Sequence, residues 1–84
     1  SWTLQLKTAN DISTLQGFKR RYKLGKAARI TETSAKGKVR YHLLYGTYGN
    51  KELAYIAQFK LPQSLQDNEK IWIRRYSDIQ KQMK

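Results

Sequence analysis

The sequence predicts an α+β fold of order β-α-β-β-α-β: a four-stranded antiparallel sheet with two helices on one face, followed by a short C-terminal helix. Three observations predict it. Apolar and polar residues alternate in four short segments, as they do in half-buried strands. After the first and third of these segments, apolar residues recur at helical spacing instead. The chain has 84 residues, which is enough for a single domain spanning residues 1–84.

The first half of the chain supplies a strand, a helix and a second strand. Side chains alternate through residues 1–8, and the apolar side of this strand consists of Trp2, Leu4 and Leu6. Asn10 and Asp11 are candidate N-caps, because a short side-chain oxygen can accept from the free N–H groups of the first helical turn. The apolar positions of this helix are Ile12, Leu15, Phe18 and Tyr22. Gly25 is a candidate stop, and residues 27–33 form the second strand.

The second half repeats the pattern. Residues 34–37 are expected to form a hairpin loop, and residues 39–45 a strand whose inward side carries Val39, Tyr41, Leu43 and Tyr45. A helix capped by Asn50 follows, with Leu53, Ala54, Ala57 and Leu61 on one face. Pro62 ends it, because proline lacks an N–H, and a turn with Leu65 leads into a strand over residues 71–76. The terminal helix should start at a capping box of Ser77 and Gln80 and carry Ile79 and Met83.

The composition excludes several classes of protein. The chain has 17 Lys and Arg against 6 Asp and Glu, a formal net charge of +11, no cysteine and one histidine. It therefore has no disulfide framework, thiol nucleophile or multi-histidine metal centre, and no run approaches the ~20 apolar residues of a membrane span. A chain this short buries roughly 60% of its unfolded surface, which leaves little room for an enclosed active site. We expect a binding module rather than an enzyme, with no cofactor and no metal.

The candidate site is the sheet face that the two helices leave open. Its expected residues are Thr3, Gln5, Lys7, Arg29, Arg40, His42, Leu44, Trp72, Arg74 and Tyr76. This set has no carboxylate pair for acid–base catalysis, and the serines of the chain are better explained as turn or cap residues than as nucleophiles. Trp72 stands out, because a large ring on an open face is covered either by a ligand or by the C-terminal helix.

Such a face suits an extended, partly anionic polymer. Aromatic rings stack on nucleobases and, by the same flat contact, on sugar rings, while Arg and Lys pair with phosphate or carboxylate. A glycan strand and single-stranded nucleic acid therefore both qualify. Nucleic acid is the second hypothesis, because residues 38–45 lack the RNA-recognition signature and place Tyr41 and Tyr45 on the core face. A third hypothesis is docking of a protein partner. We expect no specific nucleic-acid binding.

Several short motifs in order resemble those of SPOR domains, a peptidoglycan-binding family. Thr-Leu-Gln-Leu at residues 3–6 is similar to the start of the family's first strand. Residues 41–48 are similar to its Y-R-V-x-V-G-P-F segment, and residues 50–54 to the helix start that follows. Three further features resemble more narrowly the SPOR domains of DamX-type cell-division proteins: Leu61-Pro62, Trp72 and a basic C-terminal helix ending in Lys84.

The resemblance implies a non-catalytic module that binds glycan strands lacking stem peptides. It implies a periplasmic domain, outside the membrane, at the C-terminus of a longer, membrane-anchored inner-membrane protein at the division site, with other division proteins as further candidate partners. The candidate glycan groove comprises Gln5, Thr8, Arg40, His42, Trp72 and Arg74. Gln5, Thr8 and Trp72 match groove positions of the family. Arg40 departs from the pattern, because an aromatic residue often stands there, and we expect a charge contact with the lactyl carboxylate of muramic acid instead.

Overall fold

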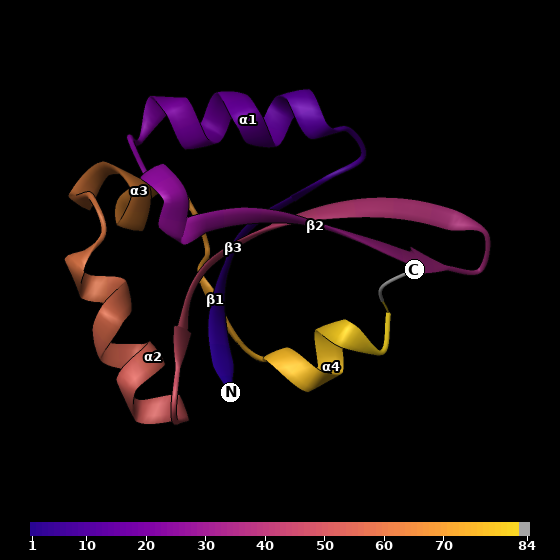
Figure 1. Cartoon of the computed structure of the whole chain (residues 1–84). Helices are drawn as coiled ribbons and strands as arrows, with labels where there is room; N and C mark the ends of the chain where they lie inside the picture. The colour runs from indigo at the N-terminus through magenta and orange to yellow at the C-terminus, as the bar shows by residue number, and fades with distance from the viewer. Residues whose placement is uncertain (83–84) are drawn as a thin grey trace.

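A computed structural model describes residues 1–82 and shows the predicted α+β architecture, with an antiparallel sheet of strand order β2-β3-β1-β4 (Figure 1). The strands are β1 (Trp2–Ala9), β2 (Ala28–Ala35), β3 (Lys38–Tyr48) and β4 (Trp72–Arg75). The helices are α1 (Ile12–Arg21), α2 (Lys51–Ala57), α3 (Gln63–Asn68) and α4 (Tyr76–Gln80), with 3₁₀ turns η1 (Gly25–Ala27) and η2 (Gln58–Lys60). No helix within residues 1–82 is long and apolar enough to cross a membrane.

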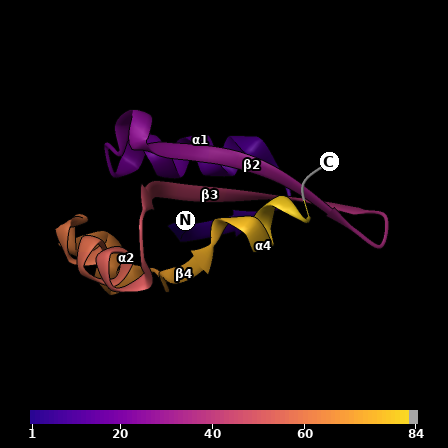
Figure 2. The same cartoon turned by 60° about the horizontal axis from the view of Figure 1, so that its bottom comes forward.

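The main core lies between one sheet face and helices α1, α2 and α3. Its buried members are Leu4, Leu6, Leu15, Phe18, Tyr22, Leu24, Ala28, Leu43, Ala54, Leu61 and Leu65. Helix α4 lies on the opposite face of the sheet from α1 (Figures 1 and 2). The two faces therefore differ: one is packed under three helices, and the other carries a single short helix.

The starts of α1 and α2 follow the predicted caps. The Asp11 carboxylate accepts from the Thr14 N–H at 3.0 Å, and the Asn50 side-chain oxygen accepts from the Leu53 N–H at 2.8 Å. Each bond satisfies a donor that the first helical turn would leave free. The Asp11 pKa is lowered, chiefly by the Ser13 hydroxyl and then by Thr14, because these donors favour the charged carboxylate.

The end of α1 differs from the prediction that Gly25 stops it. Lys23 adopts the left-handed conformation, with φ of 52°, two residues earlier. The Leu24 N–H bonds the Lys19 carbonyl at 3.1 Å and the Lys23 N–H bonds the Arg20 carbonyl at 3.2 Å, which is the paired closure of a Schellman motif. Lys23 therefore occupies the left-handed position that glycine usually takes after a helix. The prediction from Gly25 placed this stop signal two residues too late.

The β2–β3 hairpin loop is shorter than the predicted residues 34–37. Lys36 and Gly37 both have positive φ, 53° and 78°, and Ala35 still pairs with Lys38. Positive φ at both central residues is typical of a type I′ turn, whose twist matches that of the flanking strands. The strands consequently stay paired up to a two-residue loop.

The helical segment after β3 is more broken than predicted. The α-helix gives way to the 3₁₀ turn η2 at Gln58, so the predicted helical face does not continue to Leu61. Within α2, Ala54 is buried and Leu53 is exposed, although both were predicted to share the inward face. The expected turn around Leu65 is helix α3. Ile12, predicted to be in the core, is also exposed, because the first residue of α1 lies beyond the buried part of that helix.

The C-terminal helix starts one residue earlier than the predicted capping box. Its N-cap is Arg75, no side chain caps the helix, and Ser77 lies inside the first turn. Ile79 is buried as predicted. Met83 and Lys84, which we expected to continue this helix, lie outside the described residues.

Among the glycines of the described chain, Gly46 in β3 is the one at which a side chain should lower stability most. Its φ is +73°, and a Cβ there would overlap the hydroxyl and ring of Tyr48. Left-handed backbone costs a non-glycine residue about 1–2 kcal/mol, and displacement of the half-buried Tyr48 ring by the new Cβ adds about 1 kcal/mol. We expect Gly46→Ala to lower the unfolding free energy, measured with urea, by about 2–3 kcal/mol.

Gly37→Ala is the matched control. Gly37 has a similar φ of +78° and open space around its Cα. This variant should lose only the backbone cost of about 1–2 kcal/mol. Equal losses for the two variants would show that the approach of Tyr48 to Gly46 contributes nothing.

Candidate ligand-binding site

A β-bulge in β1 determines which of its side chains reach the α4 face of the sheet. Gln5 lies opposite Leu44 and Lys7 lies opposite Leu43, so β1 advances two residues while β3 advances one. Thr8 then lies opposite His42. The extra residue reverses the alternation, as bulges do. Gln5 and Thr8 therefore share one face although three positions separate them.

The same bulge removes Lys7 from this face, so its predicted place there is wrong. The Lys7 ammonium lies 3.3 Å from the Glu69 carboxylate and 5.6 Å from the centre of the Phe18 ring. Both partners belong to the side of α1 and α3. Simple alternation from Gln5 had placed Lys7 on the other side, and a bulge leaves no mark in that pattern.

A row of hydrogen-bonded side chains crosses the α4 face from β4 to β2. Arg74 Nη1 donates to Gln5 Oε1 at 2.9 Å, and Gln5 Nε2 donates to Thr8 Oγ1 at 3.3 Å. Thr8 Oγ1 lies 2.9 Å from His42 Nδ1, and Thr33 Oγ1 lies 2.8 Å from His42 Nε2. We call these five residues the polar row. It joins all four strands and brings together four of the six predicted site residues.

Thr33 is the member of the polar row that sequence reasoning missed. The sequence pattern places Arg29 of β2 on this face. Side chains at every second position of a strand point the same way, so Thr33, four residues after Arg29, lies on this face too. It is buried, and its hydroxyl is bound to His42. A threonine in a strand carries no signal that distinguishes this role from ordinary β-propensity.

His42 occupies the centre of the polar row as a neutral side chain. It is 8% exposed, and both ring nitrogens bond threonine hydroxyls. Burial lowers the pKa of His42, and the positive charges of Arg74 and Arg40 lower it further. With its nitrogens taken by Thr8 and Thr33, the ring is placed to fix these hydroxyls.

Trp72 lies at the end of the polar row, directly opposite Gln5 in the β1–β4 ladder. Its side chain is 52% exposed, and the Lys70 ammonium lies 4.6 Å from the ring centre. The sequence left two possible covers for this ring, a ligand or the C-terminal helix. Within residues 1–82, about half of the Trp72 surface stays open to solvent.

Helix α4 closes the other part of this face (Figure 2). At its first residue, the Tyr76 N–H donates to the Ser1 carbonyl at 2.8 Å, and two residues after its end the Gln82 carbonyl accepts from the Ser34 N–H at 2.9 Å. Leu44 and Ile79 are both buried, although neither belongs to the main core. The predicted open face is therefore smaller than expected. Leu44 and Thr3 are buried, and Tyr76 belongs to α4.

The strand residues of this face carry positive charge. In the part of the chain that the structure describes, none of these strand residues is acidic: Thr3, Gln5, Thr8, Arg29, Thr31, Thr33, Arg40, His42, Leu44, Trp72 and Arg74. Arg40 and Arg29 are exposed, and Arg29 lies 5.9 Å from the Tyr76 ring. Such a surface favours an anionic or hydroxyl-rich ligand.

Within residues 1–82, no group of three or more His, Cys, Asp or Glu side chains could hold a metal ion. A comparison with models of known protein families finds none that matches the chain, and a comparison with characterised proteins also finds no match. The geometry of this face and the motifs of the sequence are the grounds for a functional proposal.

Proposed function

We propose that this domain binds peptidoglycan glycan strands that lack stem peptides, without catalysis. The observation that carries the proposal is the half-exposed ring of Trp72 beside Gln5 and Arg74, at the end of the polar row, on a face to which the described strands contribute no acidic side chain. In the proposal, the domain belongs to a periplasmic part of an inner-membrane protein and directs it to the division site. The resemblance to SPOR domains supports this choice among polymers.

The residues at this end of the row match the chemistry of a sugar chain. A tryptophan ring offers a flat apolar surface for the C–H face of a pyranose, as it does for other rings. Gln5 and Arg74 hold each other at 2.9 Å, which pre-orients an amide and a guanidinium toward hydroxyl groups. Removal of the stem peptide leaves the lactyl carboxylate of muramic acid free. A cation on this face is then able to pair with a carboxylate next to the sugar ring that the amide bond to the stem peptide otherwise masks.

Single-stranded nucleic acid is supported less well by the same geometry. The residues of β3 on this face are Arg40, His42 and Leu44, whereas Tyr41 and Tyr45 point to the main core. Base-stacking surfaces need successive aromatic rings, and Trp72 is the one exposed ring that the described strands place here. The net charge of +11 would still attract any polyanion at low salt.

Arg40 provides a test of the charge contact. Its side chain is exposed and lies on the same face as the polar row. We expect Arg40→Ala to weaken binding to peptide-free glycan fragments by about fivefold at low salt and by less than about twofold near ~0.5 M salt, because screening weakens exposed charge pairs. Calorimetric titrations at both salt concentrations measure this. Arg20→Ala, an exposed cation on α1, is the control. A loss that does not change with salt would contradict a charge role.

The proposal is tested directly by a titration of the isotope-labelled domain with soluble peptide-free glycan fragments at ~0.15 M salt, where the Debye length is about 8 Å. Amide signals of Gln5, Thr8 and Trp72 should shift in a saturable way, and signals of α1 should not. Shifts confined to the basic side of α1, or no shift by a folded domain, would overturn the proposal.

A further inference from the structure

The outer edge of β4 carries backbone groups that pair with no strand of the described chain. β4 is the last strand in the sheet order, with β1 on one side only (Figure 2). The Tyr76 N–H bonds the opposite carbonyl of Ser1, and hydrogen-bonded positions alternate along an antiparallel ladder. Arg74 therefore also turns its backbone groups toward β1. Those of Ile73 and Arg75 point away from the sheet.

A hollow lies beside this edge, between β4 and α2. Its volume is about 430 Å³, and it is lined by Lys51, Glu52, Tyr55, Ile56 and Ile73. Ile73 contributes its side chain to the hollow and its free backbone groups to the edge. The two features are therefore adjacent through one residue.

The helix beside the hollow exposes an unusual amount of apolar surface. Four large apolar side chains of α2 and η2 are 51–57% exposed: Leu53, Tyr55, Ile56 and Phe59. The rings of Tyr55 and Phe59 contact each other edge to face at 5.2 Å. Grouped exposed apolar side chains mark interaction sites more often than scattered ones do.

We propose that an extended segment of another protein, in which apolar residues alternate with acidic ones, pairs with the outer edge of β4 as a fifth strand. One of its apolar side chains fills the hollow between Ile56 and Ile73. Addition of a strand to a free edge gives affinity through the backbone, and a side-chain pocket gives specificity. This surface lies outside the polar row, so the inference is independent of glycan binding.

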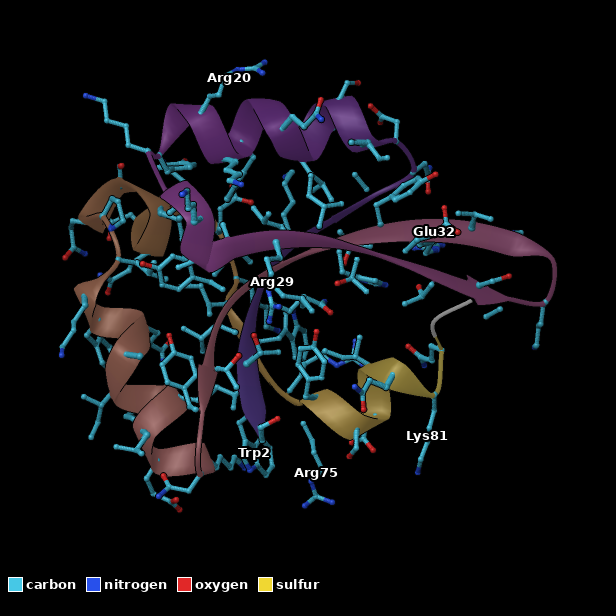
Figure 3. All side chains as sticks on the ribbon, viewed as in Figure 1. Trp2, Arg20, Arg29, Glu32, Arg75 and Lys81 are labelled. Carbon is cyan, nitrogen blue, oxygen red and sulfur yellow. The ribbon has the colours of Figure 1, made fainter. Side chains whose placement is uncertain are left out.

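The charge around the edge selects acidic residues in the partner. Lys51 lines the hollow, and Arg75 is the last residue of β4, with its guanidinium 5.1 Å from the Trp2 ring (Figure 3). Lys70 lies beside Trp72 at the start of the strand. Glu52 is the one carboxylate among the residues that line the hollow. Lys51 and Glu52 balance each other at the hollow. The excess of positive charge therefore comes from Lys70 before β4, Arg75 within it and the net charge of +11 of the chain. This excess favours an acidic segment.

The same observations argue against two other occupants. A second copy of the chain would bring another net charge of +11 against this surface, and such like charge opposes association. A lipid bilayer would leave the free N–H and C=O groups of Ile73 and Arg75 without partners in hydrocarbon. A peptide strand satisfies these groups and reduces the net charge.

The test uses a blocked peptide of alternating glutamate and valine, about seven residues long, which is enough to span β4. Fluorescence anisotropy measures its binding to the 84-residue chain at ~0.15 M salt, where charges further apart than about 8 Å are screened. We expect saturable binding that Ile56→Glu weakens at least about tenfold. Ile12→Glu, the same substitution at an exposed isoleucine of the remote α1, should leave the affinity unchanged.

Two control peptides separate the parts of the proposal. In the first control peptide, methylation of alternate backbone nitrogens removes the N–H donors that pair with β4 and should abolish binding. In the second, lysine replaces glutamate, and binding should be lost because the peptide then has the same charge as the surface. Absence of binding by the parent peptide, equal binding by either control peptide, or equal affinity of wild type and Ile56→Glu would each overturn the proposal.

Discussion

Replacement of Trp72 by alanine should weaken the binding of peptide-free glycan fragments by about thirtyfold, which corresponds to about 2 kcal/mol. The ring is 52% exposed and lies opposite Gln5, so its free surface is available for a sugar ring. Buried tryptophans at the centre of binding sites commonly contribute at least about 2 kcal/mol. Isothermal titration calorimetry with soluble fragments measures the change, and the unfolding free energy should fall little because half of the ring is already in solvent.

The matched control for this prediction is Phe59→Ala. Phe59 is 57% exposed, similar to Trp72, but it lies in η2 away from the polar row. A general loss of exposed aromatic surface would affect both variants alike. If Phe59→Ala weakens glycan binding as much as Trp72→Ala, Trp72 is not part of the site.

The second large effect is expected at His42, which should make stability depend on pH. Its pKa in the folded state is lowered by burial and by the charges of Arg74 and Arg40. The unfolded chain therefore binds a proton at a higher pH than the folded chain does. Stability is then fully present above about pH 6.5, the unfolded value, and decreases as the pH falls toward the lowered folded pKa. Urea unfolding between pH 7.5 and 5 measures the decrease.

His42→Phe should remove this dependence and also lower stability at pH 7.5. The variant loses two hydrogen bonds and leaves the buried Thr33 hydroxyl without its partner, at a cost of about 2 kcal/mol. Because His42 is the only histidine of the chain, no other imidazole can produce the slope. An unchanged slope between pH 7.5 and 6 in the variant would assign the dependence to other groups.

The sequence predicted the strands, the two capped helix starts and most of the strand residues on the α4 face, because these follow from local patterns. Alternation identified Gln5, His42, Trp72 and Arg74 as neighbours on one face, and the β-pairing agrees. Asp11 and Asn50 cap their helices as predicted. Each of these features depends on residues that are close in sequence.

The errors arise where the structure depends on tertiary contacts or on an extra residue. The bulge in β1 moves Lys7 to the main-core side and brings Thr8 beside His42. Alternation alone had separated Gln5 from Thr8, whereas the resemblance to SPOR domains implied that both line the groove. The path of α4 across the face could not be predicted either, because it is determined by distant contacts such as the bond from Ser34 to Gln82.

The most direct test of glycan recognition is co-sedimentation of the domain with purified sacculi at ~0.15 M salt, where exposed charges are screened beyond about 8 Å. Untreated sacculi are compared with sacculi from which an amidase has removed the stem peptides, using wild type, Gln5→Ala and Trp72→Ala. We predict stronger binding of wild type to the stripped sacculi, and loss of this preference in both variants. Equal binding to the two preparations, or no binding by the folded domain, would contradict recognition of peptide-free glycan on this face.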